Sequence, residues 1–142
     1  MKKNNMKRVT LVPGDGIGPE VTDAARKIID ATGVRIKWEI IPAGEQSFEQ
    51  YKTAIPAIVF DSIKRNKVAL KGPVGTPVGK GFKSVNVLTR KTLNLYANLR
   101  PVKTFPGVKS KYRDIDIVVV RENTEDLYSG LEYQIAARRR RS

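Results

Sequence analysis

The stretch Arg8-Val-Thr-Leu-Val12-Pro-Gly14-Asp-Gly16-Ile-Gly18-Pro-Glu20 decides the fold class of this chain. Its first five residues form a short apolar segment that predicts a strand, and Pro13 ends it. Three alternating glycines then predict a tight turn. Pro19 is favourable at a first helical position, and the acid that follows it suits the first turn of a helix. The stretch therefore predicts a strand, a turn and a helix in immediate succession.

Strand and helix patterns continue to alternate along the rest of the chain. Helices are expected from residue 19 to near Gly33 and over residues 45–51, 56–63 and 86–96. Extended segments are expected over residues 34–41, 68–70 and 98–102, and the apolar run 115–120 predicts a buried strand. This alternation predicts an α/β fold with a parallel-rich sheet flanked by helices. Ligands bind such sheets at the carboxyl ends of strands, where we expect the Gly14 loop, the Gly72 loop and Arg121.

The composition excludes several kinds of chemistry. The 142 residues include no cysteine and no histidine, so disulfides, thiolate zinc sites and Ser-His-Asp catalysis are ruled out. A metal could be held only by carboxylates, which suits Mg²⁺ or Mn²⁺. No apolar run approaches the roughly 20 residues that span a bilayer, and no signal-peptide pattern is present. We therefore expect a cytoplasmic protein without a membrane partner.

The formal charge of +13, from 27 basic and 14 acidic residues, raises the alternative of a basic polyanion- or nucleic-acid-binding fragment. The positions of the basic residues support this alternative less than their number does. Four of the positive charges are the arginines 138–141, three more are Lys2, Lys3 and Lys7, and most of the others are scattered. A terminal basic run binds phosphate backbones non-specifically, but it is also commonly solvated.

The segment Ser84-Val-Asn86-Val-Leu-Thr-Arg90 predicts a helix start that could bind an anion. Free backbone N–H groups and the positive end of the helix dipole favour a carboxylate or phosphate there. Ser84 or Asn86 can cap the helix, and the remaining side chain can face a ligand. Asn86 and Arg90 share one helix face because they are four residues apart. An ordinary capped helix with a solvated arginine is the other interpretation, and it is the preferred one for this segment taken alone.

The glycines 14, 16 and 18 are similar to a dinucleotide-binding fingerprint, and Glu39 could be its ribose-binding acid. The fingerprint is G-x-G-x-x-G, however, and its third glycine position is Pro19 here. Proline removes one N–H from a phosphate cradle. We therefore favour a structural turn that places Asp15 and Glu20 over a pyrophosphate site.

A dense polar segment, Arg121-Glu-Asn123-Thr-Glu125-Asp126-Leu-Tyr128, follows the last apolar run. Arg121 could bind a carboxylate with two hydrogen bonds, and Tyr128 could donate a proton. An acidic cap over a helix start, with the tyrosine in the core, is the other interpretation. Arg100 lies in the stiff frame before Pro101. If Arg90, Arg100 and Arg121 converge, they suit a di- or tricarboxylic acid.

Taken together, these motifs resemble the N-terminal part of the β-decarboxylating dehydrogenases, the family of isocitrate and isopropylmalate dehydrogenases. The matching motifs are Gly14-Asp-Gly-Ile-Gly-Pro-Glu20, Lys71-Gly-Pro73, Thr76-Pro77, Ser84-x-Asn86-x-x-x-Arg90, Leu95-Tyr-Ala-Asn-Leu-Arg100-Pro101 and Arg121-Glu-Asn-Thr-Glu-Asp-x-Tyr128. They lie within residues 8–133. The resemblance predicts an incomplete fold of this family.

The resemblance implies roles for individual residues. Arg90, Arg100 and Arg121 look like the arginines that hold the substrate carboxylates. Ser84 and Asn86 match the pair that recognises the distal carboxylate of isocitrate, which favours isocitrate over isopropylmalate. Tyr128 looks like the catalytic tyrosine that protonates the enol, and Thr76 looks like a contact to the cofactor. The implied reaction is oxidative decarboxylation of isocitrate to 2-oxoglutarate, as in the tricarboxylic acid cycle, with NAD or NADP and a divalent metal, Mg or Mn.

The resemblance also implies what is absent here. The family's metal-binding aspartates, its lysine and its adenosine-binding loop match no segment before Tyr133, so no metal ligand is assigned. We expect residues 1–7 to be a disordered tail, residues 8–133 to be a portion of a dehydrogenase, and residues 134–142 to be an atypical basic tail. The tail could be a frameshifted end, an added tail or a truncated product. We expect a fragment that is inactive alone. Family members form homodimers or larger oligomers, so a non-catalytic module that pairs with a full-length homologue is a further alternative.

Overall fold

The computed structural model describes residues 6–75, 84–125 and 129. Its residues group into two compact units, Met1–Leu93 and Asn94–Ser142. Residues 1–5, Thr76, Tyr128 and the predicted basic tail 134–142 lie outside the described residues. Lys7, which we expected in the N-terminal tail, belongs to the first strand instead.

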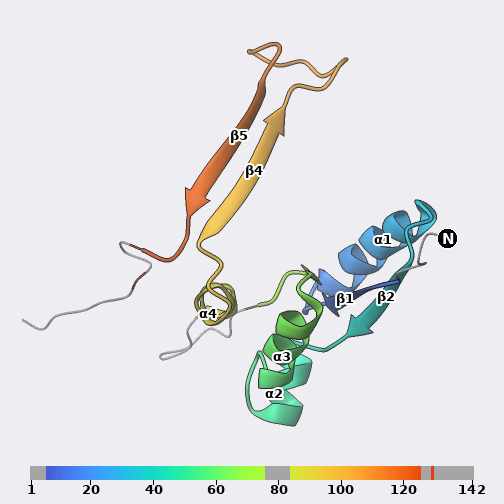
Figure 1. Cartoon of the computed structure of the whole chain (residues 1–142), viewed down its shortest axis with the longest axis vertical. Helices are drawn as coiled ribbons and strands as arrows, with labels where there is room; N and C mark the ends of the chain where they lie inside the picture. Colours follow the sequence, from blue (N-terminus) through green and yellow to red (C-terminus); the bar gives the residue numbers. More distant parts are fainter. Residues whose placement is uncertain (1–5, 76–83, 126–128, 130–142) are drawn as a thin grey trace, which may run out of the picture. The chain divides into compact units, whose positions relative to one another are not determined.

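The first unit is built on a parallel sheet. Its strands are β1 (Lys7–Val12), β2 (Ile36–Ile40) and β3 (Ala69–Lys71), in the order β2-β1-β3. Its helices are α1 (Gly18–Ala31), α2 (Glu45–Tyr51), α3 (Ala57–Asn66) and α4 (Val85–Thr92). Figure 1 shows α1 on one side of the β1–β2 pair and α3 on the other. The connection from β1 to β2 and the connection from β2 past β1 to β3 run in opposite directions across the sheet, so right-handed crossovers place their helices on opposite faces. The predicted α/β class is confirmed.

The central strand β1 carries the buried part of this unit. Thr10 and Val12 are fully buried, because β1 has a strand on each side and α3 packs against it. The Thr10 hydroxyl is 2.7 Å from the Ser62 hydroxyl on α3, so the buried polar pair is satisfied. The apolar cluster comprises Val12, Ile41, Ala43, Ile55, Val59, Val74 and Val85. Val74 lies in the loop after β3, and Val85 is the first residue of α4. Both the loop and the helix start are therefore anchored to the core.

The second unit is an antiparallel hairpin of β4 (Ala97–Lys103) and β5 (Asp116–Glu122). The apolar run predicted to be a buried strand does form β5, but its side chains are exposed: Val118 is 61% and Val120 is 64% accessible. The prediction of burial is wrong because burial of such a run requires a layer on each face, and the described part of this unit supplies two strands alone.

Most element boundaries differ from the sequence prediction by one to four residues, and two of them show why. The helix expected over residues 86–96 ends at Thr92, and Asn94 then adopts a positive φ of 51°. Asparagine tolerates this left-handed conformation, which lets the chain turn into β4. The strand expected over residues 34–41 is limited to Ile36–Ile40, whose residues pair with β1. Among the described residues, no helix has the length and apolar character needed to cross a bilayer.

Candidate anion-binding site

The parallel arrangement of β1 and β3 brings two predicted loops to one edge of the sheet. The Gly14 turn follows β1, and residues 72–75 follow β3. The backbone N–H of Asp15 donates to the carbonyl of Pro73 at 3.1 Å, which joins the two loops directly. The predicted meeting of the Gly14 and Gly72 loops at the carboxyl ends of strands is confirmed.

The start of α4 brings a lysine and an asparagine together at this edge. Ser84 occupies the N-cap position, but its side chain makes no capping hydrogen bond. The Asn86 side chain does not cap the helix either, because its Oδ1 accepts a hydrogen bond from Lys71 Nζ at 2.9 Å. Lys71 Nζ also donates to the carbonyl of Gly72 at 2.9 Å. Neither polar side chain predicted to cap the helix does so.

Lys71 was not among the site residues predicted from the sequence. It is half-buried, and burial lowers its pKa below the ordinary value; the Asp15 carboxylate opposes this shift, and the Arg90 guanidinium adds to it. Arg90 is half-buried one turn after Asn86 on α4. A signal was available in the sequence, because Lys71 ends a strand directly before a glycine-rich loop. We call Lys71, Asn86 and Arg90 the anion group.

The hairpin brings two other predicted arginines onto one face. Arg100 pairs with Val119, and Asn98 pairs with Arg121, so the two arginines are diagonal neighbours on adjacent strands. Such neighbours are within reach of long side chains. Arg121 lies inside β5 rather than beyond its end, and β5 is antiparallel to its partner. The prediction that Arg121 follows the end of a parallel strand is therefore wrong. The convergence of these arginines with Arg90 stays a prediction.

A tight turn follows Arg121. The Glu122 carboxylate accepts hydrogen bonds from the Thr124 hydroxyl at 2.5 Å, the Thr124 N–H at 2.7 Å and the Glu125 N–H at 2.8 Å. These donors, the Thr124 hydroxyl above all and then the Glu125 N–H, lower the pKa of Glu122 to about 2. The turn leads toward Tyr128. Tyr128 and Thr76, the predicted catalytic and cofactor residues, lie outside the described residues.

The Gly14 turn does not fit a dinucleotide phosphate. A Cβ added at Gly14 would lie 1.7 Å from the Pro73 carbonyl oxygen, and one at Gly18 would lie 2.3 Å from that of Pro13. These two glycines therefore allow close packing of backbone segments and leave no space for a phosphate. Glu39, the candidate ribose-binding acid, accepts hydrogen bonds from Arg65 and Asn66. The preference for a structural turn is confirmed.

Among residues 6–75, 84–125 and 129, no three Asp or Glu side chains are grouped so that they could hold a metal ion. The described residues therefore do not fit the divalent metal that the family resemblance implies, and no metal ligand is assigned to them.

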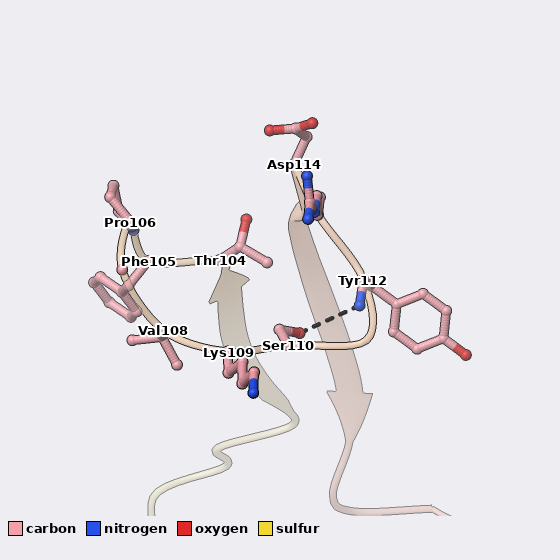
Figure 2. A pocket seen from close by; sticks show the side chains of 10 residues that line it. Thr104, Phe105, Pro106, Val108, Lys109, Ser110, Tyr112 and Asp114 are labelled. Atoms are coloured by element: carbon pink, nitrogen blue, oxygen red, sulfur yellow. Dashed lines mark hydrogen bonds between the residues drawn. The ribbon is translucent and has the colours of Figure 1, made fainter.

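A cavity of about 530 Å³ lies in the loop between β4 and β5 (Figure 2). It is lined only by residues of that loop, between positions 104 and 114, and by none of the predicted site residues. Two of the lining residues are joined by a hydrogen bond, which the Tyr112 backbone N–H donates to the Ser110 hydroxyl at 3.3 Å (Figure 2). The cavity is separate in sequence and lining from the anion group.

Comparison with known proteins agrees with the motifs. The family model for isocitrate/isopropylmalate dehydrogenase matches residues 8–141, which extends beyond the predicted limit at residue 133. A probable mitochondrial isocitrate dehydrogenase (NAD) subunit alpha of Drosophila melanogaster is 50% identical over 129 residues, which are 91% of this chain and 34% of that protein. A chloroplastic 3-isopropylmalate dehydrogenase of Solanum tuberosum is 46% identical over 132 residues, 93% of this chain and 37% of that protein.

Solved structures show the same similarity. The crystal structure of isocitrate dehydrogenase from Methylococcus capsulatus has a TM-score of 0.81 and 48% sequence identity, and the match covers 94% of this chain and 40% of that one. The chain thus spans roughly a third of the length of its curated relatives. With the family model matched over residues 8–141 and the fold shared, the chain belongs to the isocitrate/isopropylmalate dehydrogenase family.

Proposed function

We propose that this chain is the carboxylate-binding portion of a decarboxylating dehydrogenase and that its ligand is isocitrate. The observation that carries the proposal is the anion group, in which Lys71 and Asn86 are in contact at 2.9 Å and Arg90 follows one turn later. The half-buried Lys71 ammonium lies beside the start of α4, and the half-buried Arg90 guanidinium lies in its last turn. Both are suited to a carboxylate, because partial burial strengthens charge-assisted hydrogen bonds.

The second pair of arginines supports a ligand with several carboxylates. Arg100 and Arg121 share one face of the hairpin, and each can bind a carboxylate through two parallel hydrogen bonds. Ser84 and Asn86 favour isocitrate over isopropylmalate, on the family resemblance. The nicotinamide cofactor and the divalent metal that the family resemblance implies would supply the redox chemistry and the stabilisation of negative charge. This chain's own side chains would bind and orient the carboxylates, and Tyr128 would donate a proton.

Isothermal titration of the purified 142-residue chain with isocitrate tests the proposal. We expect Arg90→Gln to weaken isocitrate binding at least about ten-fold, because a charge-assisted hydrogen bond contributes roughly 1.5–3 kcal/mol. Lys91→Gln is the matched control, since it removes the same charge from the next position of α4 and should change the affinity less than about two-fold.

Failure of the native chain to bind isocitrate, or equal losses in the two variants, would contradict the proposal. Isopropylmalate is the companion ligand and should bind more weakly than isocitrate. We also expect this chain alone to show no metal-dependent reduction of NAD or NADP, measured by the absorbance of the reduced nicotinamide. Measurable reduction would overturn that expectation.

A second candidate function is a non-catalytic module that associates with a full-length homologue. The exposed apolar side chains of the hairpin favour it: Leu99, Val118 and Val120 lie on one face, and each is more than 60% accessible. Full burial of such a side chain contributes roughly 1.5–3 kcal/mol. Size-exclusion chromatography with light scattering, on the chain mixed with a homologous dehydrogenase, measures this association. A chain that elutes as a monomer in the mixture would count against it.

A further inference from the structure

Asp15 connects three loops that are far apart in the sequence. One oxygen of its carboxylate, Oδ1, accepts a hydrogen bond from the N–H of Gly75 at 2.6 Å. The other, Oδ2, accepts one from the N–H of Glu45, the first residue of α2, at 3.2 Å. Its own backbone N–H donates to Pro73 at 3.1 Å. A single side chain therefore joins the turn after β1, the start of α2 and the loop after β3.

The backbone of the neighbouring loops comes close to this carboxylate. A Cβ added at Gly44 would lie 2.2 Å from Asp15 Oδ2, and one added at Gly75 would lie 3.3 Å from Oδ1. On the other side, a Cβ at Gly14 would overlap the Pro73 carbonyl oxygen at 1.7 Å. The glycines at positions 44 and 75 therefore allow the backbone to approach the Asp15 carboxylate closely enough for both hydrogen bonds.

The loop that Asp15 holds is continuous with the anion group. Residues 72–75 begin directly after Lys71, and the Gly72 carbonyl accepts a hydrogen bond from Lys71 Nζ at 2.9 Å. Gly72 is itself confined, because a Cβ there would lie 2.1 Å from the Pro13 carbonyl oxygen. A shift of this loop would therefore move a hydrogen-bond acceptor of the lysine.

We propose that Asp15 is a positioning residue, whose carboxylate fixes residues 72–75 and so holds Lys71 in the geometry that binds a carboxylate ligand. This inference rests on the proposed function of the anion group. Asp15 is negatively charged, so direct contact with a carboxylate ligand would be repulsive; its contribution to ligand binding is through the loop.

The variant Asp15→Asn separates positioning from charge. As a nearby negative charge alone, Asp15 would oppose an anionic ligand, and its neutralisation would tighten isocitrate binding. If Asp15 is instead a positioning residue, Asp15→Asn weakens isocitrate binding. Asparagine presents an N–H₂ donor where one of the two backbone N–H groups needs an acceptor. We expect the dissociation constant for isocitrate to rise at least about five-fold, given the usual strength of hydrogen bonds to charged groups.

Amide hydrogen exchange of the full chain, followed by NMR, gives a readout that does not depend on ligand. In Asp15→Asn we expect exchange at Glu45, at Gly75 or at both to become about ten-fold faster. Asp23→Asn is the matched control. It makes the same charge change, but Asp23 forms its ion pairs with Arg26 and Lys27 on α1 and contacts none of the three loops by any hydrogen bond between described residues. It should leave both measurements unchanged.

Unchanged or tighter isocitrate binding in Asp15→Asn would overturn the inference, as would unchanged exchange at both amides. A native chain that binds no isocitrate would instead refute the proposed function, and the ligand part of the inference with it, while the exchange data would still decide whether Asp15 anchors the loop.

Discussion

At the scale of single residues, the clearest requirement of this chain is the absence of a side chain at Gly14. Its φ is +80°, and the missing Cβ position is 1.7 Å from the Pro73 carbonyl oxygen. Gly16 also has a positive φ, of +56°, but nothing lies within 4 Å of its missing Cβ. Both glycines thus have a left-handed backbone, but only Gly14 is also in close contact with another segment. Comparing the two positions therefore distinguishes the cost of backbone strain from the cost of steric overlap.

We predict that Gly14→Ala destabilises the first unit by about 2–4 kcal/mol, from backbone strain together with overpacking. Gly16→Ala should cost only about 1 kcal/mol, from the left-handed backbone alone. Urea unfolding followed by the fluorescence of Trp38, the one tryptophan of the chain, reports on this unit. Equal midpoints for the two variants would show that the Pro73 contact does not constrain the turn.

At the scale of secondary-structure elements, the turn after β5 depends on the ionised form of Glu122. The folded pKa of about 2 lies below the ordinary glutamate value of 4.5. A depressed carboxyl pKa contributes stability above the unfolded value, and that stability is lost as the pH falls from about 4.5 toward 2. The side chain is solvent-accessible, so the effect is expected locally, at the amides of Thr124 and Glu125.

NMR titration of the Glu122 carboxyl carbon should give a midpoint near 2, with parallel changes at the Thr124 and Glu125 amides. Glu122→Gln removes the titrating group and should abolish that acid-dependent change. A Glu122 midpoint near 4.5 would contradict the hydrogen-bonded turn.

At the scale of the whole molecule, the two units differ in how they protect their backbone. β1 is hydrogen-bonded on both edges and has four consecutive buried residues. Within the described part of the chain, β4 and β5 pair with each other alone, and most of their side chains are exposed. An isolated two-stranded hairpin is marginally stable in water. We therefore predict that the amides of Val9 and Leu11 exchange at least about 100-fold more slowly than those of Arg100 and Val119, which face each other in the hairpin. Hydrogen exchange by NMR measures this, and similar protection in both units would contradict it.

How much of the molecule could be predicted follows from the range of the interactions involved. The helix at residues 45–51 was predicted to the residue, because glycine and an acid mark its start locally. The anion group was predicted only in part. Asn86 and Arg90 share a helix face by spacing alone. Lys71 contacts Asn86 from another element, β3, and no local pattern encodes that contact.

The sequence by itself determined the order of strands and helices, the structural nature of the Gly14 turn, and the residue types available to bind an anion. These depend on backbone stereochemistry, on hydrophobic periodicity and on composition, which act over a few residues. Only the tertiary structure decided that Asn86 contacts Lys71 rather than capping α4, that Arg100 and Arg121 share a face, and that Asp15 fastens the loop of Gly75. The physical reason is that strand register and loop packing join residues separated by 15 to 60 positions, and chain spacing does not specify such distances.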